Sequence, residues 1–578
     1  MKLIHYLFLM FALPLPFAGR SQEDLHEFYE TLARKGEVKF RFVEKDAARI
    51  AQLSHVVSID GRKDSLYSAY ANQEEFRQFL SLGYEPLRME DAIAKAGIEM
   101  AATIEEMQDW NRYPTYGLYL EMMRNFAEKY PHICRLDTIG KSVQGRLILC
   151  LAISDSVDKE EPEPGFFYSS SIHGDELTGF VLMLRLIDHL LSHYGTDAEA
   201  TRLVNEMHLY INPLSNPDGA YKRSDSSVAG ATRYNANNID LNRNYPDFWK
   251  GSAGTLQPEN QAMIEYVQKH DFVMSVNIHG GSDVLNFPWD AFTSSHRKHA
   301  DYDWWVEVSK RYVDTCRKVD NSAYRDVNQL GYVDGGDWYV VNYGRQDYMN
   351  AFRHVREQTL EISVTKLPAS SRLPSFWNIN HRALINYMKE AGYGIRGRVS
   401  DSVSGQPVRA LVTVRNHDKD SSQVYSSPVH GMFFRPIAAG SYDLVFSAPG
   451  YHDKVVNAVV AADFSVTHCD VRLVPVGLPA DTTEIPQDTV ANRPYESFLG
   501  YRISPNPVRD LLVVQADFPF TVDAVYNVAG KQMPLSTETR GGFSNRFALS
   551  VSAYPQGLYM LQVRARNGEI QRLKFIKP

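Results

Sequence analysis

Apolar runs alternate with helical patterns along the central part of the chain. Buried strands are predicted at residues 148–153, 165–170, 208–212, 272–278 and 359–363, and residues 177–193 have the apolar spacing of a long helix. Strands that are apolar on both faces and separated by helices are typical of a parallel sheet. We therefore predict an α/β domain over residues 109–393, with a mostly parallel mixed sheet covered by helices on both faces.

After Gly394 the pattern changes to short alternating strands separated by Gly and Pro turns. Such strands are predicted at 395–399, 410–414, 441–447 and 471–474, which is typical of a small β-sandwich. Residues 476–498 combine Pro and Thr with little hydrophobic pattern and are predicted to be a linker. The last segment is again all-β. The chain should thus end in two small all-β sandwich domains, at 394–475 and 499–578.

A charge-rich segment, residues 22–108, precedes the α/β domain. It contains helical patterns at 25–32 and 74–82 and short strand-like runs at 55–59 and 66–70. These patterns fit either a small N-terminal domain or a pro-segment, and the sequence does not decide between the two.

Residues 1–21 have the parts of a cleaved secretory signal peptide. Lys2 precedes an apolar run from Leu3 to Phe17, and small residues follow up to Ser21. The alternative, a hydrophobic N-terminal helix, is disfavoured because the run is short and interrupted by prolines. No later apolar run reaches the roughly 18 residues of a membrane-spanning helix. We predict an exported protein without a transmembrane span.

Composition excludes several classes of protein. The chain has 578 residues, about four times a usual domain of ~150 residues, which agrees with several domains. A net charge of -8 gives no basic footprint for nucleic acid. The 4 cysteines are scattered and form no CxxC pair, which argues against a disulfide scaffold or a structural zinc site. Cys134 and Cys150 flank a predicted hairpin, so a disulfide between them stays open.

Candidate metal ligands follow two of the predicted strands. His173 and Glu176 come directly after the strand at 165–170, and His279 ends the strand at 272–278. Two imidazoles and one carboxylate are the ligand set of a catalytic zinc that keeps its fourth position for water. Taken alone, an HxxE pair is a weak signal, and His279 followed by two glycines also fits a core histidine at a tight turn.

Two other segments carry polar groups in unusual places. Asn242 and Arg243 lie in an Asn-rich loop, where they would supply an amide and a forked cation for a carboxylate, although turn chemistry explains such a loop equally well. Asp240 would orient a ligand histidine. Glu361 lies inside an apolar strand, and a buried, ionised Glu needs a metal, a cation or a role. The alternative is that Glu361 points outward.

These motifs occur together in the order and spacing of a known family. The stretches HGDE (173–176), RYNANNIDLNRNYPDF (233–248), VNIHGG (276–281) and TLEIS (359–363) resemble those of the zinc metallocarboxypeptidases. The chain is most similar to the regulatory-type branch, which also has a transthyretin-like β-domain directly after the catalytic domain. Residues 394–475 resemble that domain.

The resemblance implies one zinc ion per chain and a set of residues around it. His173, Glu176 and His279 resemble the zinc ligands, and Asp240 resembles the partner of a ligand histidine. Glu361 resembles the general base, which takes a proton from water and later passes it to the leaving amine.

Substrate contacts are implied in the same way. Arg233, nine residues before Asn242, resembles the Arg that stabilises the oxyanion, and Asn242 with Arg243 resembles the pair that grips the terminal carboxylate. Tyr339, 22 residues before Glu361, resembles the Tyr that closes over the substrate. Since an internal peptide bond offers Arg243 no carboxylate, these residues indicate exopeptidase action.

Specificity rests on the pocket for the C-terminal side chain. Gln346, fifteen residues before Glu361, resembles a residue that lines this pocket. An acidic residue is expected after the His-Gly-Gly turn, but Ser282 stands there and Asp283 follows it. The resemblance still predicts a preference for basic C-terminal residues, although Ser282 departs from the family's pattern at this position.

The tail carries a second resemblance. The stretches YRISPNPV (501–508), VYNVAG (525–530), GLY (557–559) and RLKF (572–575) are similar to the C-terminal sorting domain of type IX secretion. The alternative is a generic adhesion-type β-sandwich. The resemblance implies passage through the periplasm and across the outer membrane of a Gram-negative bacterium, to the cell surface or the medium, with the type IX machinery as a partner.

The sequence thus predicts a secreted zinc metallocarboxypeptidase that acts on peptides or proteins with a free C-terminus. One alternative is a peptidoglycan-stem peptidase of the same fold. Another, from a different class, is a surface binding or adhesion protein in which the β-domains matter most. The presence of His173, Glu176, His279 and Glu361 favours an enzyme.

Overall fold

The computed structural model describes residues 22–89, 97–478, 495–496, 501–527, 531–535, 543–565 and 570–578. The predicted signal peptide and most of the linker at 476–498 lie outside these residues. Within the described part, no helix is long and apolar enough to cross a membrane.

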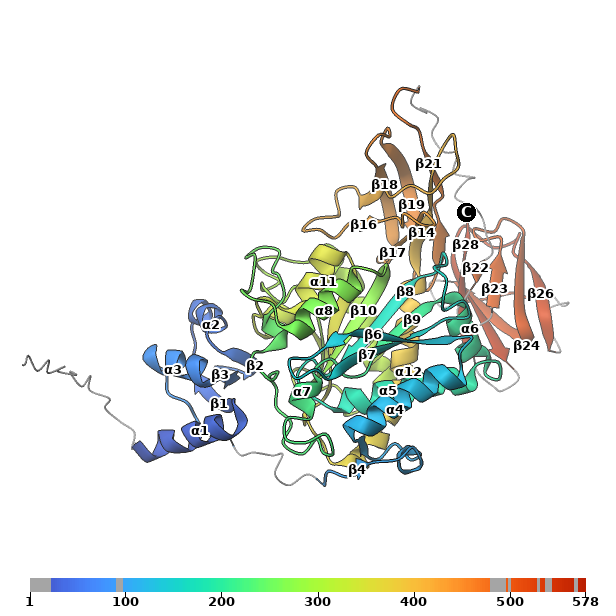
Figure 1. The fold of residues 1–578 in the computed structure, drawn as a ribbon. Helices are drawn as coiled ribbons and strands as arrows, with labels where there is room; N and C mark the ends of the chain where they lie inside the picture. Colours follow the sequence, from blue (N-terminus) through green and yellow to red (C-terminus); the bar gives the residue numbers. More distant parts are fainter. Residues whose placement is uncertain are drawn as a thin grey trace, which may run out of the picture.

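An eight-stranded sheet forms the centre of the molecule (Figure 1). Its strand order is β12-β11-β13-β10-β8-β9-β7-β6. The middle strands β9, β8, β10 and β13 are mutually parallel, β11 and β12 are parallel to each other, and β7 and β6 are antiparallel to their neighbours. The bounds are β6 Cys134–Lys141, β7 Leu147–Ile153, β8 Gly165–Ser170, β9 His208–Asn212, β10 Phe272–His279, β11 Ser282–Phe287, β12 Tyr332–Asp334 and β13 Arg356–Ser363.

Helices cover both faces of this sheet, so the predicted mixed α/β fold is confirmed. One apolar cluster joins the sheet to α4, α5, α6, α9 and α12, and a second joins its other face to α8 and α11. The bounds are α4 Tyr116–Lys129, α5 Thr178–His193, α6 Ala198–Glu206, α8 Pro258–Val267, α9 Tyr302–Arg317, α11 Arg345–Arg353 and α12 Leu373–Lys389. The short helices α7 (Pro217–Ala220) and α10 (Gly335–Trp338) lie in loops.

The central strands β8, β10 and β13 are buried along their whole length. In β10, Met274, Val276 and Ile278 pack into the first cluster, so the alternate residues Asn277 and His279 face the other side. Side chains at the carboxyl ends of these parallel strands meet at one edge of the sheet, which is where open α/β sheets bind ligands.

Two β-sheets follow the α/β domain and enclose a core of their own. One sheet contains β17, β14, β20 and β21, and the other has the order β16-β15-β18-β19. The bounds are β14 Gly394–Asp401, β15 Leu411–Val414, β16 Val424–Tyr425, β17 Met432–Arg435, β18 Gly440–Ser447, β19 Lys454–Ala461, β20 Val466–His468 and β21 Val471–Leu473. The predicted β-sandwich is confirmed.

The last domain is also all-β and has a separate apolar core. Its long strand β24 pairs with β23 and β26 in its first half and with β25 and β27 in its second half. The bounds are β22 Tyr495–Glu496, β23 Tyr501–Ser504, β24 Leu511–Asn527, β25 Gln532–Met533, β26 Ser544–Ser550, β27 Gly557–Ala565 and β28 Ile570–Lys577.

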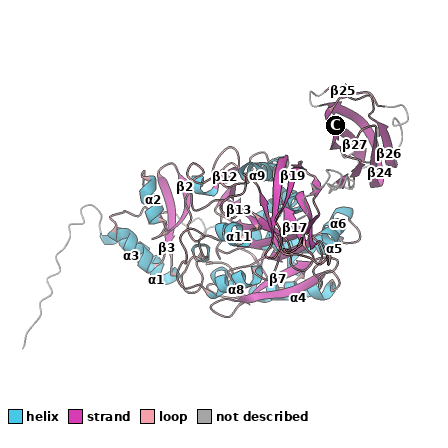
Figure 2. Ribbon diagram, turned by 90° about the horizontal axis from the view of Figure 1, so that it is seen from above, coloured by secondary structure: helices cyan, strands magenta, loops and turns pink. Residues whose placement is uncertain are grey.

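The segment before the α/β domain contains a small separate domain. Its sheet has the order β1-β3-β2 and packs with helices around its own apolar core. The bounds are α1 Gln22–Lys35, β1 Val38–Val43, α2 Ala47–Leu53, β2 Ser58–Lys63, β3 Leu66–Ala71 and α3 Gln73–Ser81. We call residues 22–89 the N-terminal domain. In Figures 1 and 2 it lies beside the α/β domain.

Two expectations need correction here, and one open question is settled. The strand predicted at 55–59 begins only at Ser58, because residues 54–57 form the turn that follows the helix Ala47–Leu53. The boundary at residue 108 is too late, since Ala101 and Met107 pack in the core of the α/β domain next to β4 (Met100–Ala101) and β5 (Tyr113–Pro114). The question of a disulfide between Cys134 and Cys150 is also settled: the four cysteines are all free, and the hairpin β6–β7 pairs Cys134 with Ile153 and not with Cys150.

Candidate functional site

A cluster of His173, Glu176 and His279 lies at the carboxyl ends of the central strands. One ligand atom of each residue falls within 4.8 Å of those of the other two. Glu176 Oε1 is 3.0 Å from His173 Nδ1, and Glu176 Oε2 is 2.9 Å from His279 Nδ1. Two imidazole nitrogens and a carboxylate that converge in this way suit a zinc ion.

The other ring nitrogens of the two histidines are held by polar partners. His173 Nε2 lies 3.1 Å from Asp240 Oδ1, and His279 Nε2 lies 2.8 Å from Asn277 Nδ2. Such contacts fix the ring orientation, so that both Nδ1 atoms are left to face the cluster. Asp240 is thus the residue that contacts the outer ring nitrogen of His173.

Glu361 lies in β13 directly beside His279 of β10, with which it is paired in register. The carboxyl group is buried, and its Oε2 has no hydrogen-bond partner among the described residues. Burial and the nearby charges of Glu176 and Asp60 raise the pKa of Glu361 well above its ordinary value. A buried carboxyl group without a partner needs a cation or water that the protein itself does not provide.

Arg233 connects the cluster to its surroundings. Its Nε donates to Asp240 Oδ2 at 3.0 Å, while Nη1 lies 3.1 Å from His173 Nδ1 and 3.4 Å from Glu176 Oε1. The buried guanidinium is thus next to the place where a metal and a reacting carbonyl would lie. Its position agrees with the predicted role in stabilising an oxyanion.

The residues predicted to bind the substrate carboxylate lie in the loop after Asp240. Arg243 Nη2 donates to the carbonyl of Ile59 at 2.8 Å, and its buried Nε has no partner among the described residues. Asn242 Oδ1 accepts from the backbone N–H of Arg345 at 2.9 Å. Tyr339 lies within electrostatic range of Glu361 and Arg243, and burial raises the pKa of its hydroxyl.

A buried acidic group lies around Gln346, and the sequence did not predict it. Gln346 Nε2 donates to Asp290 Oδ1 at 2.7 Å, and both carboxylate oxygens of Asp334 are buried without partners, as is Gln346 Oε1. Burial and the neighbouring Asp347 raise the pKa of Asp290 well above its ordinary value, and burial raises the pKa of Asp334 to about 8. A cation bound beside Asp290 and Asp334 would stabilise their ionised forms.

The structure does not bring Asp283 to this group. Its carboxylate accepts the backbone N–H groups of Tyr324 and Asp326, each at 2.9 Å, and so caps a loop. Ser282 begins β11 opposite Ser363. Asp290 stands eleven positions after His279 and three positions after the end of β11, and nothing in the sequence distinguishes it from other acidic residues.

Lys366 is a second residue that sequence reasoning missed. Its ammonium group lies 2.8 Å from Glu176 Oε1 and 2.8 Å from Asp60 Oδ1. Lys366 lies in the loop after β13. From the sequence, a single lysine in a loop is expected at the surface, and only the fold shows that Lys366 is buried.

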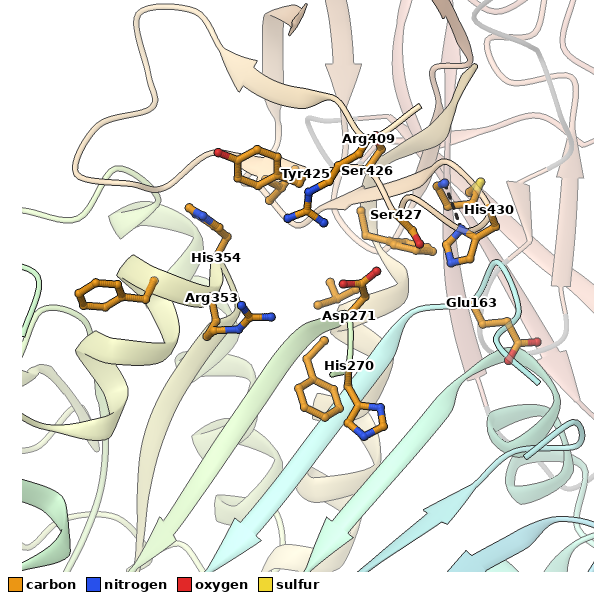
Figure 3. A pocket seen from close by; sticks show the side chains of 16 residues that line it. Glu163, His270, Asp271, Arg353, His354, Arg409, Tyr425, Ser426, Ser427 and His430 are labelled. Carbon is orange, nitrogen blue, oxygen red and sulfur yellow. Dashed lines mark hydrogen bonds between the residues drawn. The ribbon is translucent and has the colours of Figure 1, made fainter. Parts of the chain in front are cut away.

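A cavity of about 240 Å³ lies elsewhere, between the α/β domain and the β-sandwich (Figure 3). It is lined by His270 and Asp271, just before β10, and by residues of the β-sandwich such as Arg409 and Ser427. The amino end of β10 points into it, whereas the metal-ligand cluster lies at the carboxyl end. The cavity is therefore separate from the candidate site.

Comparisons with known proteins agree with this geometry. Residues 119–383 match the zinc carboxypeptidase family, 394–474 match the carboxypeptidase regulatory-like domain, and 502–577 match the secretion system C-terminal sorting domain. Carboxypeptidase M of Mus musculus is 33% identical over 344 residues, which is 57% of this chain and 77% of that protein. The chain belongs to the zinc carboxypeptidase family, and it carries a C-terminal secretion sorting domain.

Other relatives are larger or more distant. Carboxypeptidase D of Homo sapiens is 33% identical over 370 residues, covering 62% of this chain and 26% of its own length, so the chain spans about a quarter of that relative. The solved carboxypeptidase A from Helicoverpa armigera is 17% identical, with a TM-score of 0.47, over 62% of this chain and 97% of that one.

Proposed function

We propose that this protein is a zinc-dependent carboxypeptidase that removes C-terminal residues from peptides or proteins. The observation that carries the proposal is the convergence of His173, Glu176 and His279 beside the buried carboxyl group of Glu361, whose Oε2 has no hydrogen-bond partner among the described residues. A binding protein would have no need of a carboxyl group kept without a partner beside a metal site.

The donor set fits zinc, with His173 Nδ1, His279 Nδ1 and the Glu176 carboxylate as the ligands. When bound, zinc would supply a Lewis acid that acidifies water and polarises the scissile carbonyl. The residues around it would do the rest. Glu361 is placed to take a proton from water and to return it to the leaving amine.

Two arginines would bind different negatively charged groups of the substrate. Arg233, beside the metal ligands, would stabilise the negative charge that develops on the scissile carbonyl oxygen. Arg243 and Asn242 would bind the terminal carboxylate, and Tyr339 would close over the bound residue. Because only the C-terminal residue has a free carboxylate for Arg243 to bind, the enzyme would cleave at the chain end and not at internal bonds.

The substrate class follows from the acids around Gln346. Asp290 and Asp334 are buried without a basic side chain hydrogen-bonded to them. A lysine or arginine side chain at the substrate's C-terminus would provide the missing cation. We therefore propose a preference for basic C-terminal residues, with Asp290 and Gln346 as the residues that select them and Ser282 outside this contact.

The place of action follows from the two ends of the chain. The sorting domain at 502–577 supports export by the type IX machinery, and the predicted signal peptide would serve the first membrane. The mature protein would then act at the surface of a Gram-negative cell or in its surroundings. Peptides with a free C-terminus would be its partners there.

The test is release of the last residue from matched peptides ending in Arg, Lys, Phe or Ala, either as free acids or as amides. The mature chain and its Asp60→Asn variant are both assayed with zinc and with a chelator. The variant is included because Asp60 contacts Arg233, the arginine proposed to stabilise the oxyanion. Cleavage of free acids only, abolished by the chelator, supports the proposal. Bound zinc without turnover of these peptides would point to a peptidoglycan-stem substrate, and a chain that binds no zinc would favour a surface binding protein.

A further inference from the structure

The cavity between the α/β domain and the β-sandwich has charged side chains on both of its walls (Figure 3). Arg353 and Asp271 line it from the α/β domain, and Arg409 lines it from the β-sandwich. Its volume of about 240 Å³ exceeds the roughly 150 Å³ that holds a benzene molecule and is below the roughly 300 Å³ at which drug-sized pockets begin. The cavity therefore suits a small polar metabolite.

Neither arginine has a counter-ion within the described part of the chain. Arg353 ends α11, and its buried Nε has no hydrogen-bond partner there. The guanidinium of Arg409 lies 5.0 Å from the centre of the Tyr425 ring, a cation–π contact that does not neutralise its charge. A buried donor without a partner costs free energy, which a bound anion would recover.

Both arginines approach the same histidine, His354. Burial lowers the pKa of His354, and the nearby charges of Arg353 and Arg409 lower it further. Since the two arginines come from different domains, like charges face each other across the interface, where they repel. A carboxylate bound between them would stabilise the contact between the two domains.

Asp271 provides the opposite charge in the same cavity. Its carboxylate forms no hydrogen bond or ion pair with any described residue, the two arginines included. Its charge acts on His430, whose Nε2 lies 3.9 Å from a carboxylate oxygen of Glu160. The cavity thus contains two cations and an acid that do not neutralise one another.

An occupant must therefore carry charges of both signs. A simple anion would meet the Asp271 carboxylate, and a simple amine would meet the two guanidinium groups. We propose that this cavity is a binding site for a free amino acid, with its carboxylate between Arg353 and Arg409 and its ammonium group beside Asp271. Guanidinium groups bind carboxylates through paired, charge-assisted hydrogen bonds. Because each domain supplies one of the cations, the ligand would join the two domains.

This site goes beyond the proposed function and does not depend on it. The cavity lies at the amino end of β10, whereas the candidate metal ligands lie at the carboxyl end. Only the source of the ligand is connected with the proposed activity, because a carboxypeptidase releases free amino acids. The affinity of the cavity is measurable without turnover of any peptide.

The first experiment measures binding of amino acids to the mature full-length chain by calorimetry. Leucine, lysine and glutamate are titrated singly, since they differ in the charge of the side chain. The one that binds most tightly is then compared with its deaminated and its decarboxylated analogues. We expect each analogue to bind at least about tenfold more weakly, because each lacks one of the two charges. Failure of all three amino acids to bind would overturn the proposal, and so would an analogue or inorganic phosphate that binds as tightly as the amino acid.

Two substitutions, one in each domain, locate the bound carboxylate. Arg353→Gln and Arg409→Gln remove one cation each, and neither side chain has an ion pair among the described residues to lose. Arg415→Gln is the matched control, since Arg415 is exposed just after β15 of the same β-sandwich. We expect at least about tenfold weaker binding in the first two variants and unchanged binding in the control. An affinity that is unchanged in either Arg353→Gln or Arg409→Gln would overturn the proposal.

A third substitution separates this cavity from the candidate site. Arg243→Gln removes the residue proposed to bind the substrate carboxylate, so an amino acid bound there would be lost. We expect binding to persist in Arg243→Gln and to weaken in Arg353→Gln. The reverse result would place the amino acid in the candidate site and overturn this inference. Peptide hydrolysis without binding in the cavity would keep the proposed function and reject this inference, whereas binding in the cavity without hydrolysis would do the opposite.

Discussion

At the scale of single residues, the site depends on which atom each side chain presents. His173 and His279 both direct Nδ1 to the cluster, because Asp240 and Asn277 hold their Nε2 atoms. Glu361 is next to them and has an unpartnered oxygen. The same side chains in other rotamers would not bring these ligand atoms and the carboxyl group of Glu361 together.

Replacing Glu361 by Gln keeps the size of the side chain and removes the proposed base. We expect hydrolysis to fall by about 10²–10⁴-fold, the usual contribution of general acid–base catalysis, while zinc remains bound at one per chain. Rates are measured with the mature chain as the parent, and zinc by elemental analysis. Undiminished turnover in Glu361→Gln would assign the base to another residue.

Replacing Asp240 by Asn weakens the support of His173. We expect the affinity for zinc to fall by about 10–100-fold, as for other partners of metal-ligating histidines. Competition with a chromophoric chelator measures this without any assay of activity. Asp271→Asn serves as the control, because Asp271 is exposed at the cavity shown in Figure 3 and remote from the cluster. An unaltered zinc affinity in Asp240→Asn would refute the orienting role.

At the scale of elements, the site is assembled from segments that are distant in the chain. His173 follows β8, His279 ends β10 and Glu361 lies in β13, and these strands are adjacent and parallel. Asp290 lies just after β11, which pairs with β13 on its other side. The strand order therefore brings the candidate metal ligands and the acidic residues around Gln346 to the same edge of the sheet.

This arrangement predicts how pH affects the affinity for basic substrates. Burial raises the pKa of Asp334 to about 8 and that of Asp347 to about 7, and Asp290 is raised as well. A cationic side chain binds the ionised form, so below these pKa values its binding must release a proton. We expect KM for peptides ending in Lys to fall as pH rises from about 6 to 8, by up to about tenfold per unit.

The measurement compares peptides ending in Lys and in Leu over the same pH range. The Leu peptide shows how much of the change in KM comes from titration of groups other than the acidic residues around Gln346. In Asp290→Asn the preference for Lys over Leu should decrease by about tenfold or more, because the cation loses a charged partner. A preference that is the same in Asp290→Asn and the parent would remove Asp290 from the specificity pocket.

At the scale of the whole molecule, buried charges join the α/β domain to the β-sandwich. Asp301 accepts from Arg435 Nη2 at 2.8 Å, from Arg356 Nη2 at 2.7 Å and lies 2.8 Å from His417 Nε2. Arg435 also contacts Asp418. Both arginines are fully buried, so each depends on these carboxylates for compensation.

Replacing Asp301 by Asn should therefore destabilise the protein strongly. We expect a loss of about 3–5 kcal/mol, the usual cost of removing one partner from a buried ion pair. Urea unfolding followed by fluorescence measures the change, with the exposed Asp303→Asn as control. Because the arginines hold the pKa of Asp301 well below its ordinary value, its contribution is present at neutral pH and is lost only as pH falls below about 4. A decrease in the free energy of unfolding below about 1 kcal/mol would show that the buried arginines do not depend on Asp301 for charge compensation.

Much of this could be predicted from local signals. The central strands, the long helix α5 and the β-sandwich were predictable because strand and helix periodicity is written in consecutive residues. His173, Glu176, His279 and Glu361 could be named as candidates because their motifs resemble those of a known family, whereas their position in or after buried strands is a weak signal taken alone. The strand predicted at 55–59 was wrong in part, since turn residues there have a strand-like composition.

The sequence by itself determined the α/β and all-β character of the main segments, the family and the candidate metal ligands. Only the tertiary structure decided that Asp290 approaches Gln346, that Lys366 is buried beside Glu176, and that Asp60 contacts Arg233. The physical reason is the range of each signal. Periodicity and motif spacing act over a few residues, whereas these contacts join residues 56 to 190 positions apart, and chain folding alone brings them together.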